Sequence, residues 1–158
     1  MGNQKTKLWI RLGSCIYAMA YAIGLPIIFG IQDSYSSYHG NSSDWFTVAT
    51  IIVTTGLWLH RSREWEIPAG ALIAVSLFNM FDWPIIHFTA AIIFFVSATA
   101  IMIRDKRYGL YGIISLMFYP ILMTQGGLFW FEATQIILVA AYHMRRVLHL
   151  IELNKEVT

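Results

Sequence analysis

The Lys and Arg residues of this chain are sorted along the sequence in a pattern that strongly limits its fold. Short polar or turn-forming stretches separate six apolar segments: residues 8–31, 45–60, 67–82, 84–103, 109–124 and 128–150. All 11 Lys and Arg residues fall near the N-terminus, near the C-terminus, or in the second or fourth connection. If each segment crosses a membrane once, these four places lie on the same side of it.

The same charges predict the orientation of the chain. The positive-inside rule makes the basic side cytoplasmic, and the opposite side would hold Asp33, Asp44 and Asp82 with no basic residue. A four-span alternative would merge residues 67–103 into one helix broken at Pro84, but it would put the basic stretch 104–109 on the wrong side. We therefore predict a multi-pass integral membrane protein with both termini in the cytoplasm.

The composition agrees with a membrane environment. Hydrophobic residues make up 57% of the chain and charged residues only 13%, whereas soluble domains carry about 25% charged residues. Segments of about 16 residues reach about 24 Å as helices, which is short of a ~30 Å hydrocarbon core. We expect Trp residues at segment ends to make up the difference at the interfaces, namely Trp45, Trp58, Trp65 and Trp83. The predicted fold is an all-α integral membrane protein, a single bundle over residues 1–158 with six transmembrane helices arranged as three hairpins.

Polar residues inside the apolar segments mark the candidate site. Ionisable groups within a membrane usually face the bundle interior and pair with one another, which makes them functional candidates. With six spans, the relevant residues lie near the non-cytoplasmic ends of the third, fourth and sixth segments, and we predict that they form a ligand pocket: Asn79, Asp82, His87, Glu132 and Gln135. His87 would be a switchable donor and Glu132 its partner charge. Asp82 has a structural alternative, because Asp is a good N-cap for a helix whose first turn contains Pro84.

One stretch has the pattern of a known family. The sequence FNMFDWPIIHFTAAIIFFVSATAIMI, residues 78–103, resembles the third-to-fourth-span region of the DRAM-like family of six-span membrane proteins, with matches at Asp82, His87, Phe94 and Phe95. The resemblance implies a role in lipid and membrane homeostasis without a defined catalytic mechanism. The first outer loop lacks the Cys residues that some members carry, and the fifth and sixth segments show no match.

Three other functions stay open at this point. Ser76, Asp82 and His87 resemble part of the site of metal-dependent membrane lipid hydrolases related to alkaline ceramidases, although one span is missing and the spacing of His143 and His149 differs from theirs. A proton or ion conductor could use Asp82, His87 and Glu132. Two facing imidazoles could hold a haem b, and His60 and His143 are the residues that could lie at one depth.

The function that we favour is not enzymatic. We expect a small membrane protein that binds a lipid or another apolar ligand, or that serves as a membrane subunit of a larger assembly. Its partners would be membrane lipids and either other membrane proteins or a second copy of the chain, and we expect no nucleic-acid partner, no metal and no resident cofactor.

Overall fold

The computed structural model describes residues 2–59 and 62–156, and it describes side chains for residues 4–38, 47–59 and 62–153. Within these ranges the chain is helical and has no strand. Six α-helices follow one another: α1 (Gly2–Phe29), α2 (Tyr38–Trp58), α3 (Glu66–Leu77), α4 (Pro84–Arg104), α5 (Leu110–Met117) and α6 (Gly127–Glu156). Three short 3₁₀ segments join them: η1 (Tyr35–Ser37), η2 (Arg63–Trp65) and η3 (Tyr119–Met123). The prediction of an all-α bundle of six helices is confirmed.

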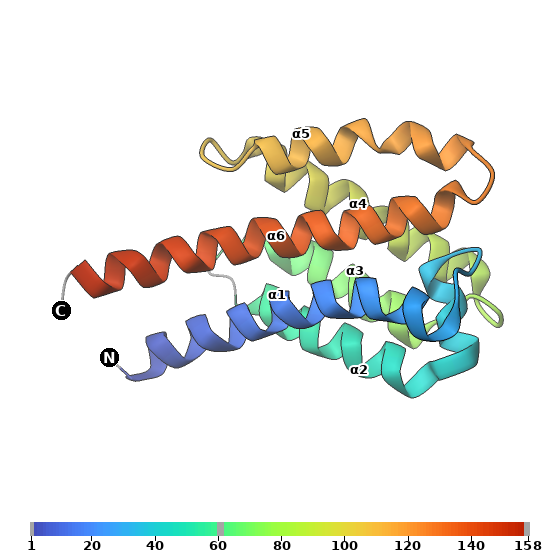
Figure 1. Ribbon diagram of the computed structural model, residues 1–158, viewed down its shortest axis with the longest axis horizontal. Helices are drawn as coiled ribbons and strands as arrows, with labels where there is room; N and C mark the ends of the chain where they lie inside the picture. Colours follow the sequence, from blue (N-terminus) through green and yellow to red (C-terminus); the bar gives the residue numbers. More distant parts are fainter. Residues whose placement is uncertain (1, 60–61, 157–158) are drawn as a thin grey trace.

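Five helices, α1, α2, α3, α4 and α6, surround a common axis, and α5 packs against α4 and α6. Each helix packs against its neighbours in sequence, and α1 also packs along α6, so that the first and last helices close the bundle. The helices alternate in direction, and both chain termini lie at the same end, where α1 and α6 extend beyond the other helices (Figure 1). Helices in a ring turn their inner faces toward one common axis, so residues far apart in sequence meet there.

The packed core is richest near the end that holds the termini. Trp65, from η2, is fully buried and packs with Phe94 and Met102 of α4 and with Tyr142 of α6. A second cluster near the opposite end joins α1, η1 and α6 through Tyr35 and other buried side chains: Ala22, Leu25, Tyr38, Phe129 and Ala133. The prediction that Trp65 lies at a membrane interface is therefore wrong, because its ring is fully buried among side chains of α4 and α6. The side chain of Trp45 lies outside the described residues.

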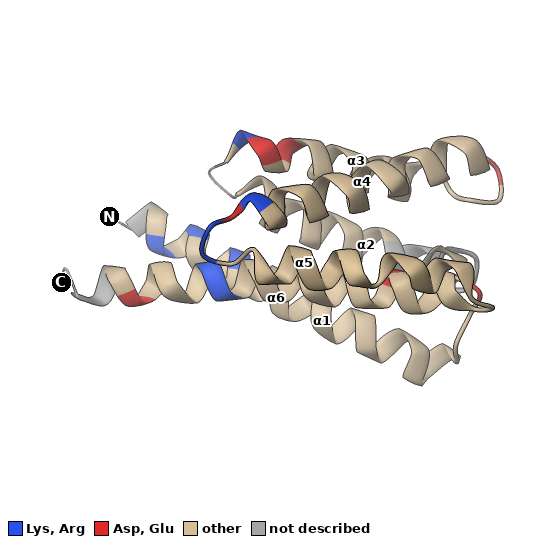
Figure 2. Cartoon of the chain, turned by 90° about the horizontal axis from the view of Figure 1, so that it is seen from above, with Lys and Arg blue, Asp and Glu red and all other residues tan. Residues whose placement is uncertain are grey.

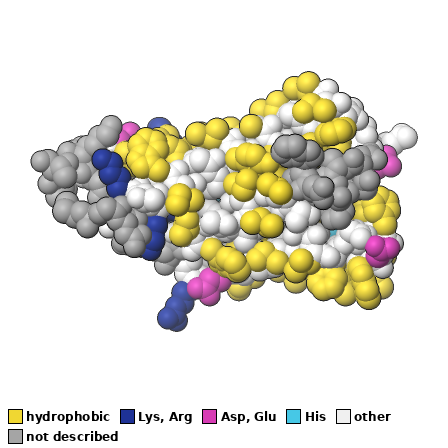
Figure 3. Space-filling model, turned by 90° about the horizontal axis from the view of Figure 1, so that it is seen from below, with side chains coloured by type: hydrophobic (Ala, Val, Ile, Leu, Met, Phe, Trp, Pro, Cys, Tyr) yellow, Lys and Arg dark blue, Asp and Glu magenta, His cyan; other side chains and the backbone are white. Residues whose placement is uncertain are grey.

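The outer surface is apolar over most of its length. Hydrophobic side chains are spread along the face shown in Figure 3, and charged side chains gather toward its two ends. Figure 2 shows the described Lys and Arg residues at the end with the termini. Among the described residues, two helices are long and apolar enough to cross a membrane, Gln4–Phe29 and Pro84–Arg104, while Thr47–Trp58 and Leu110–Met123 are apolar but shorter.

Two helices end earlier than the apolar segments predict. α3 ends at Leu77 rather than at residue 82. The Asn79 side-chain oxygen accepts hydrogen bonds from the backbone N–H groups of Phe81 and Asp82, and these bonds compete with the helical hydrogen bonds. The segment 109–124 is not one helix: α5 ends at Met117 and is followed by η3. Pro120 explains this change, since its ring excludes a continuous α-helix and it has no N–H to donate, and the tighter 3₁₀ turns that follow use bonds such as Ile121 N–H to Phe118 O.

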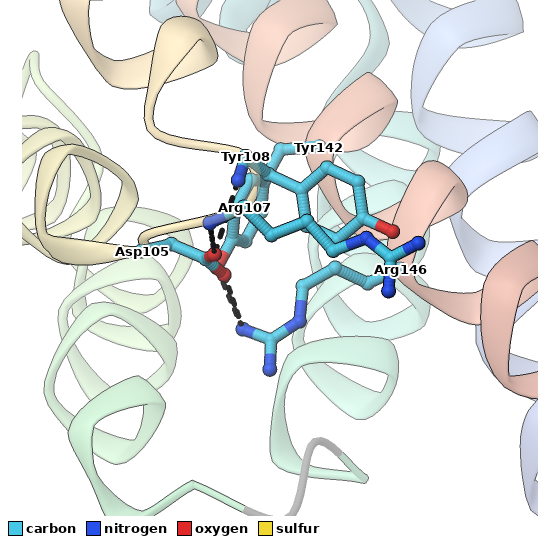
Figure 4. Close-up of polar contacts among 5 residues, drawn as sticks. All are labelled: Asp105, Arg107, Tyr108, Tyr142 and Arg146. Carbon is cyan, nitrogen blue, oxygen red and sulfur yellow. Dashed lines mark hydrogen bonds and ion pairs between the residues drawn. The ribbon is translucent and has the colours of Figure 1, made fainter.

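A polar cluster fixes the α4–α5 turn to α6 (Figure 4). The Tyr142 hydroxyl donates to Asp105 Oδ2 at 2.7 Å, and Arg146 Nη1 lies 3.1 Å from the same oxygen. The other carboxylate oxygen accepts the backbone N–H groups of Arg107 and Tyr108. Partial burial raises the pKa of Asp105, but the three hydrogen bonds and the charge of Arg146 outweigh it, so the pKa lies below its usual value.

Candidate ligand pocket on the bundle axis

The inner faces of the helices enclose a pocket with a volume of about 100 Å³. The lining side chains come from α1, η1, α2, α3, α4 and α6, and on each long helix they follow a stripe with helical spacing. On α1 the stripe is Arg11, Ser14, Ala18 and Tyr21, with Cys15 beside it. Small side chains in these stripes leave the space: Ser14, Ala18, Ala49, Gly56, Ala91 and Ala140.

The pocket is polar at its two ends and apolar between them. Glu132 and His143 both line it from α6, and they are eleven residues apart, which corresponds to about 16 Å along a helix. The α6 residues between them that face the pocket are Ile136, Val139 and Ala140. The apolar middle section also receives side chains from the facing helices: Ala18, Ala49, Val53, Leu72, Val75, Ala91, Phe94 and Phe95.

One end of the pocket is closed by the connection between α1 and α2. The backbone N–H of Tyr35 donates to Glu132 Oε2 at 2.6 Å, and the Tyr35 ring stacks on Phe129 with the ring centroids 5.0 Å apart. Ser36, on the same 3₁₀ turn, also lines the pocket. Glu132 is 6% exposed, so its carboxylate acts here as a buried acceptor that holds η1 over the pocket.

His87 contributes to the same pocket from the first turn of α4. Its Nδ1 lies 2.7 Å from the carbonyl oxygen of Phe78, which has no helical partner because α3 ends just before it. This bond assigns the proton to Nδ1 and leaves Nε2 as an acceptor in the neutral ring. The imidazole is 1% exposed. His87 and Glu132, two of the predicted site residues, are therefore both buried and both line the pocket.

The other end of the pocket carries two basic side chains. Arg11 of α1 and His143 of α6 line it and are 5% and 4% exposed. The His143 ring packs edge-on against Trp65, with the ring centroids 4.1 Å apart. This is the end of the bundle that holds the two chain termini (Figure 1). A buried guanidinium requires compensation by hydrogen bonds or opposite charge, which makes this end chemically distinct from the Glu132 end.

Asn79 and Asp82 do not belong to the pocket. Both lie in the turn between α3 and α4, where Asn79 Nδ2 donates to Asp82 Oδ2 at 2.6 Å and Asn79 Oδ1 accepts from the Asp82 N–H. The cap hypothesis for Asp82 is also wrong, because the N-cap residue of α4 is Trp83 and it makes no side-chain cap bond. Asn79 and Asp82 are not on a common helical face, since α3 has already ended at Leu77.

Gln135 faces α5 rather than the pocket. The Ser115 hydroxyl donates to Gln135 Oε1, and Gln135 Nε2 donates to the Ser115 carbonyl oxygen at 3.0 Å. Ser115 Oγ also lies 2.7 Å from Thr99 Oγ1 of α4. The single hydroxyl proton of Ser115 is already committed to Gln135, so Thr99 is the donor in that bond. This buried chain joins α4, α5 and α6 and gives Gln135 a structural role in the bundle.

Among the described residues, those suggested for metal binding are not grouped as a metal site. Ser76 Oγ donates to the carbonyl oxygen of Ile73 in its own helix, and Asp82 is exposed in its turn while His87 is buried. Among the described residues, no three His, Cys, Asp or Glu side chains are grouped so that they could hold a metal ion. For the haem hypothesis, His143 lines the pocket, but His60 lies outside the described residues.

Comparison with known proteins yields no match: no family model, no curated protein and no solved structure is significantly similar to this chain. The resemblance of residues 78–103 to the DRAM-like family therefore stays a prediction. Of its matching positions, His87, Phe94 and Phe95 line the pocket, and Asp82 does not.

The basic end of the pocket was not among the predicted site residues. Arg11 was used only as one of the charges near the start of the first segment. Its position on the pocket-lining stripe of α1 was therefore overlooked. The signal was present in the sequence, because Arg11, Ser14, Ala18 and Tyr21 repeat at intervals of three and four residues. His143 lies eleven residues after Glu132, which places both on one face of a helix.

Proposed function

We propose that this chain is an integral membrane protein of six spans that holds a lipid chain or a similar apolar ligand in its axial pocket. The observation that carries the proposal is the pocket itself, an apolar section between two polar ends inside a ring of helices whose outer surface is also apolar. A long apolar segment with a polar group at its end matches these surroundings. The resemblance of residues 78–103 to the DRAM-like family supports the same class of ligand.

Several features support the membrane setting. Exposed Trp side chains occur near helix ends at both ends of the bundle, Trp9 and Trp58 at the end with the termini and Trp83 and Trp130 at the other. Tryptophan is enriched at membrane–water interfaces. The 12-residue α3 reaches only about 18 Å as a helix. The 3₁₀ segment η2 before α3 and the turn after it add to the length over which the chain runs through the bundle.

The pocket suits an apolar ligand better than a conducted ion. An ion or proton path needs polar groups or water along its whole length, but most side chains that line the wall between Glu132 and His143 are apolar, among them Val53, Phe94 and Val139. Asp82, which the conduction hypothesis requires, lies in an exposed turn. We therefore favour ligand binding over conduction.

Native mass spectrometry tests the proposal with two substitutions on one helix. Ala91 of α4 lines the pocket, and leucine in its place would occupy part of the space. Ala100 of the same helix is exposed, so leucine is accommodated there without entering the pocket. We expect the wild-type protein and Ala100→Leu, released from vesicles, to retain a bound lipid or other apolar molecule, and Ala91→Leu to lose it.

The result that contradicts the proposal is equally specific. Equal amounts of retained lipid on the wild-type protein and on both variants would place the lipid on the outer surface of the bundle rather than in the pocket. Absence of any retained molecule from the wild-type protein would argue against a resident apolar ligand. Equal insertion of the two variants into membranes is the control for folding.

A further inference from the structure

We propose that the ligand is a single-chain amphiphile with an anionic oxygen head group, held with its head at Arg11 and His143 and its chain toward Glu132. This inference rests on the proposed function and adds to it the charge, the shape and the direction of the ligand. It is carried by the position of Arg11, a guanidinium buried at the end of the pocket opposite Glu132.

The basic end provides the chemistry for an anion. Arg11 and His143 come from two helices that pack along each other, and both are more than nine-tenths buried while lining the same pocket. A guanidinium presents several N–H donors in a planar fork that fits a carboxylate or a phosphate. Charge attraction is much stronger in such a water-poor site than at the surface. Ser14, one turn after Arg11, also lines the pocket there, although its hydroxyl donates to the Arg11 carbonyl oxygen.

The acidic end sets the direction of the ligand. Glu132 lines the far end of the pocket, where it accepts the Tyr35 N–H. An anionic head group placed there would meet the acidic side chain of Glu132 instead of the guanidinium of Arg11, which favours the orientation with the head group at Arg11. The apolar walls between the two ends then surround the chain of the ligand. A neutral head group would gain less from Arg11, and a cationic one would be repelled by it.

The size of the pocket limits the ligand to one chain. The pocket has a volume of about 100 Å³, and its lining residues His143 and Glu132 lie about 16 Å apart along α6. Pockets for drug-sized ligands are larger, at roughly 300–1,000 Å³. The small volume favours a ligand with a single chain over a two-chain lipid.

A binding assay with matched probes tests the inference. The protein is placed in nanodiscs of zwitterionic lipid, and binding of tritiated dodecanoate and of tritiated dodecanol is measured by scintillation proximity, with empty nanodiscs subtracted. Dodecyl phosphate serves as an unlabelled competitor, so that a carboxylate and a phosphate head group are distinguished. We expect the wild-type protein to bind dodecanoate about ten- to a hundredfold more tightly than dodecanol, the range for a charge-assisted hydrogen bond.

The variants separate the head-group interaction from a general loss of folding. Arg11→Gln should reduce the affinity for dodecanoate to about that for dodecanol, and the affinity for dodecanol should change much less. Arg11→Lys should retain part of the preference, because it keeps the positive charge without the planar fork. Lys7→Gln is the matched control, since Lys7 is an exposed cation on the same helix, and it should behave as the wild-type protein does.

Three other binding results would each contradict a specific claim. Equal affinity of the wild-type protein for dodecanoate and dodecanol would overturn the anionic head group and leave the apolar pocket in place. A preference for dodecanoate that survives Arg11→Gln would overturn the role of Arg11. Binding of neither probe above empty nanodiscs would overturn the inference and the proposed function together.

Discussion

Replacing Gln135 by leucine tests whether this residue holds the bundle together or belongs to the ligand site. The side chain makes two hydrogen bonds across the α5–α6 interface, one from the Ser115 hydroxyl and one to the Ser115 carbonyl oxygen. Hydrogen bonds between membrane helices contribute on average ~0.6 kcal/mol and at most about 1.7 kcal/mol each. Two such bonds predict that Gln135→Leu lowers the free energy of unfolding by about 1 to 3 kcal/mol. Ligand binding should not change, because Gln135 does not line the pocket.

A double-mutant cycle with Ser115→Ala makes this prediction sharper. Alanine removes the hydroxyl and therefore one of the two bonds to Gln135, but it keeps the backbone carbonyl oxygen that accepts the other. Gln135→Leu should consequently cost about half as much in the Ser115→Ala background as in the wild-type protein. The difference, roughly 0.6 kcal/mol with an upper limit near 1.7 kcal/mol, is the coupling energy of the lost bond.

The chain carries its own probe for this measurement. Cys15 is the single cysteine and is buried, so its reaction with a thiol-specific dye reports unfolding as SDS is titrated into mixed micelles. Gln125→Leu is the matched control, because Gln125 is exposed in the connection before α6. The reasoning is refuted if Gln135→Leu costs no more than Gln125→Leu, or if its cost is the same with and without the Ser115 hydroxyl.

Two further predictions concern the α4–α5 region. The pKa of Asp105 is lowered in the folded protein, so its contribution to stability is complete above the ordinary Asp pKa and is lost as the pH falls through the folded value. Asp105→Asn should therefore lower the free energy of unfolding at neutral pH and flatten the decline of that free energy between about pH 5 and pH 3. Asp33→Asn, which changes an exposed residue, should do neither. Gly112→Ala should cost about 1 to 3 kcal/mol, because the new methyl group meets the backbone of Met102 and Ile103. Gly70→Ala meets no atom within 4 Å and should be neutral or slightly stabilising, and thermal unfolding of both glycine variants in one detergent tests this contrast.

The number of helices could be predicted from the sequence because apolar segments and turn residues are local signals. Pro84 marks the start of α4 correctly, since proline suits the first turn of a helix. Helix ends were less predictable where a side chain competes with the backbone. Asn79 stops α3 through its own hydrogen bonds, and Pro120 converts the end of the fifth segment into a 3₁₀ turn. Both residues can be read from the sequence, but a prediction of helix ends from hydropathy alone does not take them into account.

The candidate site was only partly predictable, for a geometric reason. Glu132 and Gln135 are three residues apart on α6 and were both predicted to line the pocket, yet Glu132 faces the pocket and Gln135 faces α5. A spacing of three residues rotates a side chain by about 60° around a helix, which suffices to change the neighbour that it meets. Which helix lies on either side of α6 is set by the closure of the ring, and this information is not local. Arg11 was missed because a charge near the start of a segment was assigned to orientation alone.

The proposed function requires that the chain cross a membrane six times, and cysteine labelling of two connections measures the number of crossings. Asp33 precedes η1 at one end of the bundle, and Lys106 lies in the α4–α5 turn at the other; both are exposed, while the native Cys15 is buried. In intact cells, a membrane-impermeant maleimide should label Asp33→Cys and should label Lys106→Cys only after the membrane has been opened. Labelling of both positions from the same side would contradict the six-span arrangement and, with it, the proposed placement of the pocket across the membrane.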